Sequence, residues 1–422
     1  MDILVVGGGG REHAIIRKLR ESPQAGTIYA APGNGGIAAD AVCVDIKATD
    51  LKGMVAFAKE KKVDFVVVAP DDPLVLGMVD ALAEAGIPAF GPTKAAAAIE
   101  GSKVFSKNLM KKYHIPTAAY ETFDDPDKAI AYLDAQNRYP TVIKADGLAL
   151  GKGVVIPENR EDAVRAIHSM MEEGQFGESG RRVVMEEFLQ GIEVSVLSFT
   201  DGKIVVPMVA SMDHKRAHDH DEGLNTGGMG TIAPHPLFTP EVEARCMKEI
   251  FLPTIEAMKK EGREFRGCLY FGLMLCADGP KVIEYNCRFG DPETQVVLPL
   301  LDGDLLDIMR ATAEGRLSDV AVGRKPGAAA CVIIASGGYP LSYQKGYPIH
   351  GLDANGQAPG VTVYHAGTQC RDGQYLNNGG RVLGVTAVGE TLRQALDTAY
   401  CAVKAIGFQD SFYRTDIGAK VL

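Results

Sequence analysis

Long apolar runs are missing from this sequence of 422 residues, as is the basic segment with a cleavage site that marks a signal peptide. The eight cysteines are scattered, without a C-x-x-C pair or a histidine-rich partner motif. Structural zinc and a disulfide framework are therefore disfavoured, and we expect a protein of the reducing cytoplasm with no membrane contact. The formal net charge of −10 argues against nucleic acid as a partner.

Two nucleotide-binding fingerprints are also incomplete. Residues 3–6 form an apolar run that ends in four glycines, Gly7 to Gly10, followed by Arg11; this predicts a strand, a turn and a helix that favour an anion. Glu12 replaces the third glycine of a dinucleotide fingerprint, and no acid stands about 20 residues further on. A monophosphate ligand fits this turn better than NAD, and a turn needed only for packing remains the alternative.

The second incomplete fingerprint is a Walker A loop. Residues 139–144 and 154–156 predict a hairpin whose glycine-rich loop runs between Lys144 and Lys152. Only three residues separate Gly147 from Gly151, and Gly153 stands where a Walker A loop needs serine or threonine. A flexible loop with a cation at each end could still close over a polyphosphate. A mobile hairpin tip is the less favoured alternative.

The composition indicates an ordinary globular protein, with 46% apolar and 23% charged residues and a length suited to two to four domains. Over the first hundred residues, buried strands at 27–30, 64–69 and 87–90 alternate with helices, one of them at 76–85. This alternation predicts a parallel doubly wound sheet. Ligands bind beyond the carboxyl ends of such strands, so the loops at 7–11, 32–34 and 70–74 should share one rim.

The strongest chemical signal lies at residues 281–293. A predicted strand places Glu284 and Asn286 on one face because strand side chains alternate. A carboxylate and an amide oxygen suit Mg²⁺, and Arg288 and Asp291 follow on a segment broken by glycine and proline. Together they predict a site for a phosphoryl group and its metal. An edge strand with solvated polar side chains is the alternative.

Other charged segments lie between the hairpin and the C-terminal part. A predicted helix carries four lysines, most of them expected on a solvated face and one or two able to reach a phosphate: Lys103, Lys107, Lys111 and Lys112. Glu186 and Glu193 flank a predicted corner and could take an adenine amino group and ribose hydroxyls. Residues 225–230 read NTGGMG, so the backbone there must approach a ligand closely or turn sharply.

Taken together, these motifs resemble the ATP-grasp superfamily, which is matched by Lys103, Lys144, the glycine-rich hairpin, the EEFL segment at 186–189, Glu193 and the E-x-N of 284–286. Within it, GGREHA, HKR, NTGGMG and RFGDPETQ are similar to the glycinamide ribonucleotide synthetase family, for which RFGDPETQ is highly specific. The resemblance covers essentially the whole chain. It implies an α/β and α+β multidomain fold: an N-terminal substrate domain at 1–102 with the doubly wound sheet, an ATP-grasp region at 103–326 with a mobile lid near 120–190, and a small C-terminal α+β domain at 327–422.

The resemblance also implies a reaction. ATP, with Mg²⁺ or Mn²⁺, would phosphorylate glycine to glycyl phosphate, and the amine of 5-phosphoribosylamine would attack it to give glycinamide ribonucleotide, ADP and phosphate in de novo purine biosynthesis. A closing lid would exclude water, since free glycyl phosphate hydrolyses. The single-function form and a monomer or small homo-oligomer are expected.

Family roles carry over one residue at a time. Lys103 and Lys144 correspond to lysines on the α and β phosphates, and Gly151, Lys152 and Gly153 to the loop over them. Glu186, Glu187 and Leu189 correspond to adenine contacts, Glu193 to the ribose ligand, and Glu284 and Asn286 to the metal ligands. The implied catalytic residues are Arg288, Lys144 and Asp291. The implied substrate-binding residues are Gly9, Gly10, Arg11, Glu12, Asp71, Asp213, His214, Lys215, Arg216, Asn225, Thr226, Gly227, Gly228, Arg288, Gly290 and Asp291.

Three departures from the family pattern are visible. The strand before the one with Glu284 and Asn286 reads Gly272-Leu273-Met274, where many ATP-grasp proteins carry an acid. Asp71 stands where glutamate is common in the family, and Asp72 could substitute for it. Leu224 stands where the family often has proline. The alternatives are another ATP-grasp carboxylate–amine ligase or carboxylase of purine metabolism, an NAD-dependent dehydrogenase, and a nucleotide-binding regulatory protein.

Overall fold

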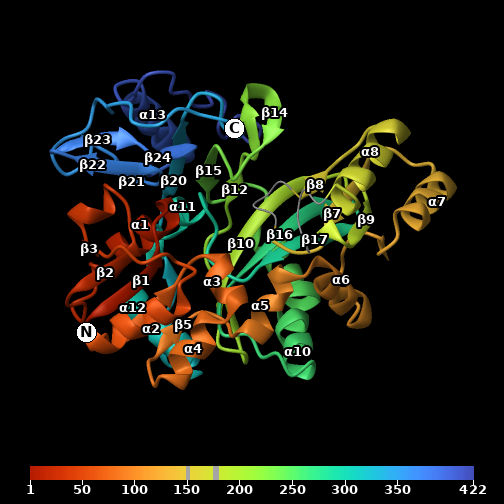
Figure 1. Cartoon of the computed structure of the whole chain (residues 1–422), viewed down its shortest axis with the longest axis horizontal. Helices are drawn as coiled ribbons and strands as arrows, with labels where there is room; N and C mark the ends of the chain where they lie inside the picture. The colour runs from red at the N-terminus through yellow and green to blue at the C-terminus, as the bar shows by residue number, and fades with distance from the viewer. Residues whose placement is uncertain (149–152, 174–179) are drawn as a thin grey trace.

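The computed structural model describes residues 1–148, 153–173 and 180–422, in which four sheets of four or five strands organise the chain (Figure 1). The first sheet is parallel, with the order β3-β2-β1-β4-β5. Its strands are β1 Ile3–Gly7, β2 Ile28–Pro32, β3 Val42–Cys43, β4 Phe65–Val68 and β5 Ala89–Phe90. The helices between and after them are α1 Gly10–Leu19, α2 Leu51–Glu60, α3 Asp71–Leu76, α4 Met78–Glu84 and α5 Lys94–Gly101. The predicted doubly wound sheet is confirmed.

One segment of the predicted rim differs from expectation. Residues 70–74 were expected to form a loop, but α3 begins at Asp71, with Pro70 as its extended N-cap residue. Asp71 and Asp72 lie in the first turn, where the positive end of the helix dipole favours acids. Pro73 is tolerated there because first-turn N–H groups have no partner within the helix. Asp71 therefore still lies just beyond the end of β4.

The described residues between 120 and 187 form a separate lobe, which stands out at the right of Figure 1. Helix α6 Lys103–Lys112 leads into an antiparallel sheet of order β6-β9-β7-β8. The lobe consists of β6 Tyr120–Phe123, α7 Pro126–Gln136, β7 Thr141–Ala145, β8 Val154–Val155, α8 Arg160–Met171 and β9 Val183–Glu187. It has its own apolar core, which includes Leu133, Ile143, Ile167 and Met185.

The central sheet has the order β11-β10-β16-β17 and is antiparallel. It is built from β10 Ile192–Thr200, β11 Val205–Pro207, β16 Gly267–Cys276 and β17 Gly279–Asn286. The helical segment of this part consists of α9 Pro240–Cys246, a π-helical turn Met247–Phe251 and α10 Leu252–Lys260. Shorter elements of this region are the hairpin β13 Arg216–His218 with β14 Glu222–Asn225, α11 Thr294–Val297, the pair β18 Leu301–Asp302 with β19 Gly323–Arg324, and α12 Leu305–Glu314.

The last large sheet has the order β12-β15-β20-β24-β21, so it combines strands from two parts of the sequence. β12 Met212–Asp213 and β15 Gly230–Ala233 come from the central part, whereas β20 Ala328–Ala335, β21 Thr362–His365 and β24 Arg381–Gly389 come from the C-terminal part. The C-terminal part also contains a separate two-stranded sheet, β22 Thr368–Arg371 with β23 Gln374–Asn377, and helix α13 Leu392–Val403. β15 pairs with β20, so the predicted boundary before residue 327 runs between neighbours of one sheet.

The N-terminal, central and C-terminal parts share a buried cluster that contains Val5, Phe199, Phe289 and Ile333. Segments distant in the sequence are therefore packed around residues 288–293. Among the described residues, no helix combines the length and apolarity that a membrane span requires.

Candidate functional site

Glu284 lies where acids and cations from three segments meet. It faces Gly272 across the β17–β16 pair, and Cβ on Gly272 would come within 3.1 Å of Glu284 Cγ, so a glycine leaves room for the acid. Lys215 Nζ lies 3.6 Å from Glu284 Oε1 and 3.5 Å from Glu193 Oε2 on β10. Burial alone would raise the pKa of Glu284, but Lys215, Lys144 and further cations together lower it. The carboxylate is therefore ionised at neutral pH.

Lys103 at the start of α6 and Lys144 on β7 of the lobe approach the same region. Lys103 Nζ donates to Gly147 O at 2.7 Å, and Lys144 Nζ donates to Ile283 O, next to Glu284, at 3.2 Å. Burial lowers the pKa of Lys103, although the charge of Glu284 opposes this shift. The two lysines predicted to hold phosphates thus lie close to the acid of the predicted metal pair.

Glu186 is buried between two lysines. Its Oε2 lies 2.8 Å from Lys107 Nζ, and its Oε1 lies 3.0 Å from Lys144 Nζ. The second contact is an ion pair that lacks hydrogen-bond alignment, so Oε1 has no hydrogen-bond donor among the described residues. Burial lowers the pKa of Lys107 to about 8. Of the four lysines of α6, Lys111 and Lys112 are exposed, whereas Lys107 is buried against Glu186 and Thr117.

The other predicted nucleotide contacts follow Glu186. Glu187 is exposed and accepts a hydrogen bond from the N–H of Ala119 at 3.0 Å, and Leu189 is half-buried on the segment that leads into β10. Gly153 is buried, and its carbonyl accepts from Ala145 N at 2.8 Å. Gly151 and Lys152 lie outside the described residues.

Arg288 joins β17 to the rim of the N-terminal sheet. Its Nη2 donates to Asn286 Oδ1 at 3.3 Å and lies 3.1 Å from Glu100 Oε1 and 3.9 Å from Asp71 Oδ2. Its Nε is a buried donor that no acceptor of the described residues satisfies. Burial would raise the pKa of Asp71, but Arg288 and Arg11 lower it. Asp71, rather than the exposed Asp72, faces this arginine.

The glycine turn before α1 lies against residues 289–291. Arg11 Nη1 donates to Phe289 O at 3.1 Å, and the backbone N of Arg11 lies 3.4 Å from Asp291 Oδ2. Glu12 Oε2 accepts from Gly9 N at 2.6 Å, so this acid closes the start of the helix. Cβ on Gly10 would lie 2.7 Å from Gln295 Nε2, so a side chain there would displace the Gln295 amide. The two predicted substrate segments are therefore in contact.

Asp213 faces the same segment from β12. Gly228 has a φ of +118°, and a side chain there would meet Pro292 and lie 2.5 Å from Asp213 Oδ1. Burial, then the nearby charge of Glu293, raises the pKa of Asp213 well above its usual range. Gly290 packs against Glu293 in the same way, since a Cβ would lie 2.8 Å from Glu293 Cδ. These glycines bring the NTGGMG and RFGDPETQ segments to one acid pair.

Four predicted substrate residues have partners within the protein. His214 is buried; Nδ1 bonds to Gly230 O at 3.1 Å, and Nε2 accepts from Gly418 N at 3.0 Å. A substrate contact would have to replace one of these bonds. Thr226 Oγ1 donates to Lys215 O at 2.8 Å. Arg216 and Asn225 are paired in the β13–β14 hairpin, where Arg216 Nη1 donates to Gly223 O at 2.8 Å.

Sequence reasoning missed three residues of this region. Glu100 and Glu293 contact the site as described, and Arg381 lies 3.5 Å from Asp291 Oδ2. Glu293 belonged to the quoted RFGDPETQ motif, so its position was available. Glu100 lies in the last turn of an alanine-rich helix, and Arg381 starts a strand more than 80 residues beyond the motif, so local pattern gave no signal for either.

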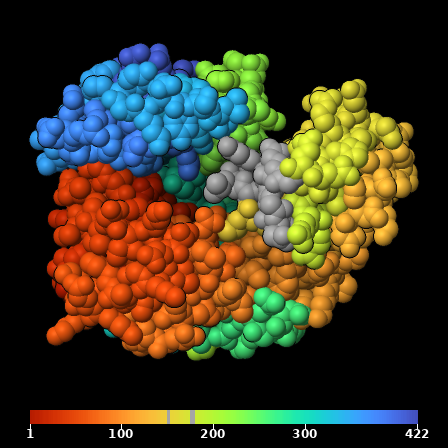
Figure 2. All heavy atoms as spheres, viewed as in Figure 1, coloured from red at the N-terminus to blue at the C-terminus, as the bar shows by residue number. Residues whose placement is uncertain are grey.

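Glu284 and Asn286 have the oxygen donors that Mg²⁺ or Mn²⁺ prefers, on one partly exposed strand face. The described residues contain no group of three or more His, Cys, Asp or Glu placed to hold a metal, so remaining ligands would come from phosphate and water. Figure 2 shows a hollow between the N-terminal part, the C-terminal part and the lobe. Cations, a carboxylate–amide pair and glycine-lined backbone at one place can hold a polyphosphate beside a small anionic substrate.

Family models match nearly the whole chain. The N domain of phosphoribosylglycinamide synthetase matches residues 1–100, its ATP-grasp (A) domain matches 101–294, and its C domain matches 329–420. Phosphoribosylamine–glycine ligase of Vibrio vulnificus strain CMCP6 is 47% identical over 425 residues, which is 100% of this chain and 99% of that protein. The Caldanaerobacter subterraneus enzyme of the same name is 46% identical over 419 residues, 99% of this chain and 100% of that protein.

The chain is also similar to solved structures. The crystal structure of phosphoribosylamine–glycine ligase from Thermotoga maritima has a TM-score of 0.85 and 32% identity, and covers 99% of this chain and 100% of that chain. A biotin carboxylase from Campylobacter jejuni, with a TM-score of 0.74, 16% identity and coverage of 98% and 92%, shares the fold. The predicted multidomain ATP-grasp architecture is confirmed, and the chain belongs to the phosphoribosylglycinamide synthetase family.

Proposed function

We propose that this protein ligates glycine to 5-phosphoribosylamine at the expense of ATP, through glycyl phosphate, to give glycinamide ribonucleotide, ADP and phosphate. The observation that carries the proposal is the position of Arg288. Its guanidinium contacts the amide oxygen of Asn286 on the nucleotide side and approaches Asp71 on the side of the N-terminal rim. A group that bridges the two sides can stabilise charge that moves from nucleotide to substrate.

In the first step, a carboxylate oxygen of glycine attacks the γ-phosphorus of ATP, and the bond between that phosphorus and ADP breaks. A carboxylate is a poor electrophile until one of its oxygens becomes a good leaving group. Lys103, Lys144 and Arg288 offset the negative charge of both reactants, and their internal partners hold them in place before substrate binds. The unsatisfied Nε of Arg288 suits a phosphoryl oxygen.

In the second step, the amine of phosphoribosylamine attacks the glycyl carbonyl, the bond to phosphate breaks, and the departing phosphate takes the amine proton. The glycine turn, Asp213 and the Asp291 segment would hold the two small substrates. Their glycines let backbone N–H groups and carbonyls approach a ligand without side-chain interference. Lys215 stays protonated because Glu193 and Glu284 raise its pKa well above the usual range.

The nucleotide side fits adenine and a metal. Glu186 Oε1, which has an ion-pair partner but no donor among the described residues, suits the amino group of adenine. Glu284 and Asn286 would hold Mg²⁺ or Mn²⁺, which when bound would offset charge on the triphosphate. A cytoplasmic location and a monomeric or small homo-oligomeric state accompany this proposal.

Phosphate release tests the proposal. We expect release only when ATP, a divalent metal, glycine and phosphoribosylamine are all present, with one phosphate per glycinamide ribonucleotide. Bicarbonate in place of glycine is the matched control, since a carboxylase would use it. Release that needs bicarbonate, or that is indifferent to glycine, would replace this function with another ATP-grasp reaction.

A further inference from the structure

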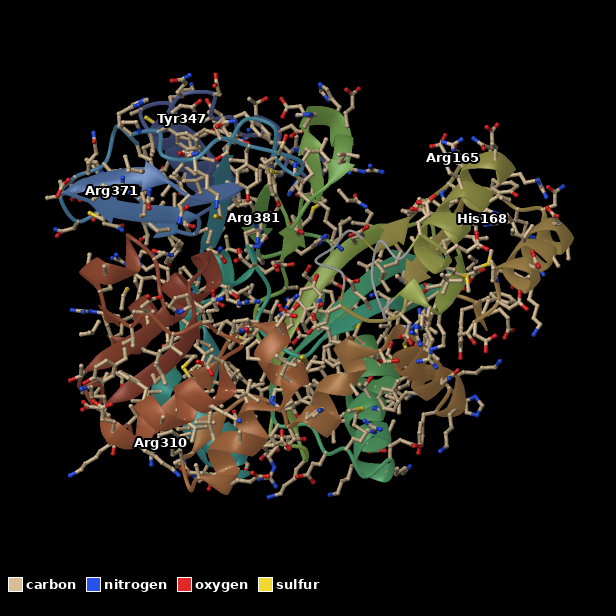
Figure 3. All side chains as sticks on the ribbon, viewed as in Figure 1. Arg165, His168, Arg310, Tyr347, Arg371 and Arg381 are labelled. Atoms are coloured by element: carbon tan, nitrogen blue, oxygen red, sulfur yellow. The ribbon has the colours of Figure 1, made fainter. Side chains whose placement is uncertain are left out.

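Arg381 connects the two substrate segments. It is the first residue of β24, and its Nη1 donates to Gly227 O at 2.8 Å and to Asp291 O at 2.7 Å. Gly228 O lies 3.5 Å from the same atom. In Figure 3, Arg381 lies at the inner side of the C-terminal part, whereas Arg371, on β22, lies toward the outer side of that part. One guanidinium from the C-terminal part therefore ties NTGGMG to RFGDPETQ.

Tyr339 holds the same loop through the backbone N–H of Gly227. The N–H of Gly227 donates to Tyr339 OH at 3.0 Å, while its carbonyl accepts from Arg381. Cβ on Gly227 would lie 2.9 Å from Arg381 Cζ, so a side chain there would displace the guanidinium from this peptide. Both polar groups of Gly227 are thus bound by residues that follow β20.

The backbone at Arg381 is itself fixed. Its carbonyl accepts from Gly367 N at 2.9 Å, and Gly367 and Gly379 cross so closely that Cβ on either would fall within 2.7 Å of the other's Cα. The N–H of Ser336 donates to Gly380 O at 2.8 Å. A side chain on so constrained a backbone loses little further freedom when it binds the two loops.

Charge reinforces the contact. Arg381 Nη2 lies 3.5 Å from Asp291 Oδ2, and Asp213 and Glu293 are also near. Asp291 is predicted to be catalytic, and Asp213 lies against Gly228. The cation therefore offsets a cluster of acids while it fixes the backbone beside them. A hydrogen bond from a charged donor contributes more than a neutral one.

We propose that Arg381 and Tyr339 form a clamp on the Gly227 peptide and that this clamp positions the 225–228 and 291 segments for binding glycine and phosphoribosylamine. Both are positioning residues, since they act through the backbone of the loops. The clamp rests on the proposed ligation and adds a role for the C-terminal part in substrate binding. It predicts a defect confined to the two small substrates, because the clamp is not in contact with Lys103, Lys144 or Glu284.

Steady-state kinetics of three variants and one control test the clamp. Arg381→Lys keeps the charge but loses the planar fork, and Tyr339→Phe removes only the hydroxyl. We expect kcat/KM for glycine and for phosphoribosylamine to fall about 10-fold or more in Arg381→Lys and about fivefold in Tyr339→Phe, with the KM for ATP within about twofold of wild type. These kcat/KM values should fall furthest in Arg381→Ala. Arg371→Ala, at an exposed arginine of the same part, should match wild type.

Hydrogen exchange of the peptide that contains Gly227, measured without substrates, separates the clamp from the reaction. We expect faster exchange in Arg381→Lys and Tyr339→Phe than in wild type and Arg371→Ala, whatever the enzyme proves to ligate. Faster exchange with unchanged kcat/KM would overturn the positioning role, as would an equal loss of affinity for ATP. Unchanged exchange would overturn the clamp itself. If Arg381→Ala fails to fold, Arg381→Lys and Tyr339→Phe still test the proposed clamp.

Discussion

Glu100 Oε1 lies 3.1 Å from Arg288 Nη2, and Glu100 Oε2 accepts a hydrogen bond from the N–H of Cys287 at 2.7 Å. One buried carboxylate on α5 therefore holds both the side chain of the arginine and the backbone that precedes it. Burial raises the pKa of Glu100, which Arg288 partly offsets. The acid orients the guanidinium beside Asn286 before any nucleotide binds.

Replacing Glu100 with glutamine tests this orientation. Glu100→Gln can still accept the Cys287 bond but loses the charge that holds Arg288, so we expect kcat to fall about 10- to 100-fold with a smaller change in KM for ATP. Steady-state kinetics measure the effect, with Glu84→Gln, at an exposed glutamate of α4, as the control. A wild-type kcat in Glu100→Gln would show that Arg288 needs no such support.

Glu284→Gln probes the predicted metal pair. The amide keeps an oxygen but removes the charge that faces Lys215, so we expect kcat to fall about 10²- to 10³-fold. Nucleotide binding measured with and without Mg²⁺ gives a second readout, and the metal should strengthen binding less in the variant. Glu256→Gln, at an exposed position of α10, serves as control. An unchanged metal dependence would place the ion elsewhere.

Lys107→Met tests the buried ion pair with Glu186. Removing one partner leaves a buried charge with fewer compensating contacts, so we expect the free energy of unfolding to fall by about 3 kcal/mol. Urea denaturation measures it. Lys111→Met, one turn along the same helix and exposed, should change stability by no more than about 0.5 kcal/mol. Equal effects of the two substitutions would contradict the burial of Lys107.

His365 should make stability depend on pH. It is buried, with Nε2 2.8 Å from Gly356 O and Nδ1 3.0 Å from Thr368 Oγ1, and burial lowers its pKa to about 4. The unfolded chain takes up this proton near pH 6.5, whereas the folded chain does so only near pH 4. Its stabilising contribution is therefore complete above pH 6.5 and is lost as the pH falls towards 4.

Between pH 6.5 and 5, this group should cost the wild type about 2 kcal/mol of unfolding free energy. His365→Gln lacks the group, so its stability should decline less over the same interval when both are followed by urea denaturation. His350→Gln, at an exposed histidine of the same part, should decline as the wild type does. Parallel curves for His365→Gln and wild type would mean that the folded protein protonates His365 freely.

Local sequence pattern was sufficient where the periodicity of side chains along one helix or strand decides the structure. The buried runs of the first hundred residues predicted a parallel sheet, and strand alternation placed Glu284 and Asn286 on one face of β17. The glycine turn before α1 was also predictable, because an apolar run that ends in four glycines marks the end of a strand and a turn before the helix. In each case the residues that decide the structure are neighbours in the sequence.

Contacts between distant segments could not be predicted in this way. Lys107 has the spacing of a surface lysine, and only the lobe sheet brings Glu186 against it. β12 and β15 carry no sign that they join β20, so the boundary expected before residue 327 runs through a sheet. Arg381 matters because β24 starts beside two loops more than 80 residues earlier. These contacts depend on which strands and helices the fold brings together, and no local sequence pattern records them.

The central step of the proposed reaction is the transfer of a phosphoryl group to the glycine carboxylate beside Glu284, Asn286 and Arg288. Glycine labelled with ¹⁸O in both carboxylate oxygens tests it directly when the phosphate released in a complete reaction is analysed by mass. Formation of glycyl phosphate predicts one ¹⁸O in each phosphate and one retained in the amide product. Phosphate without label, formed along with glycinamide ribonucleotide, would contradict the account.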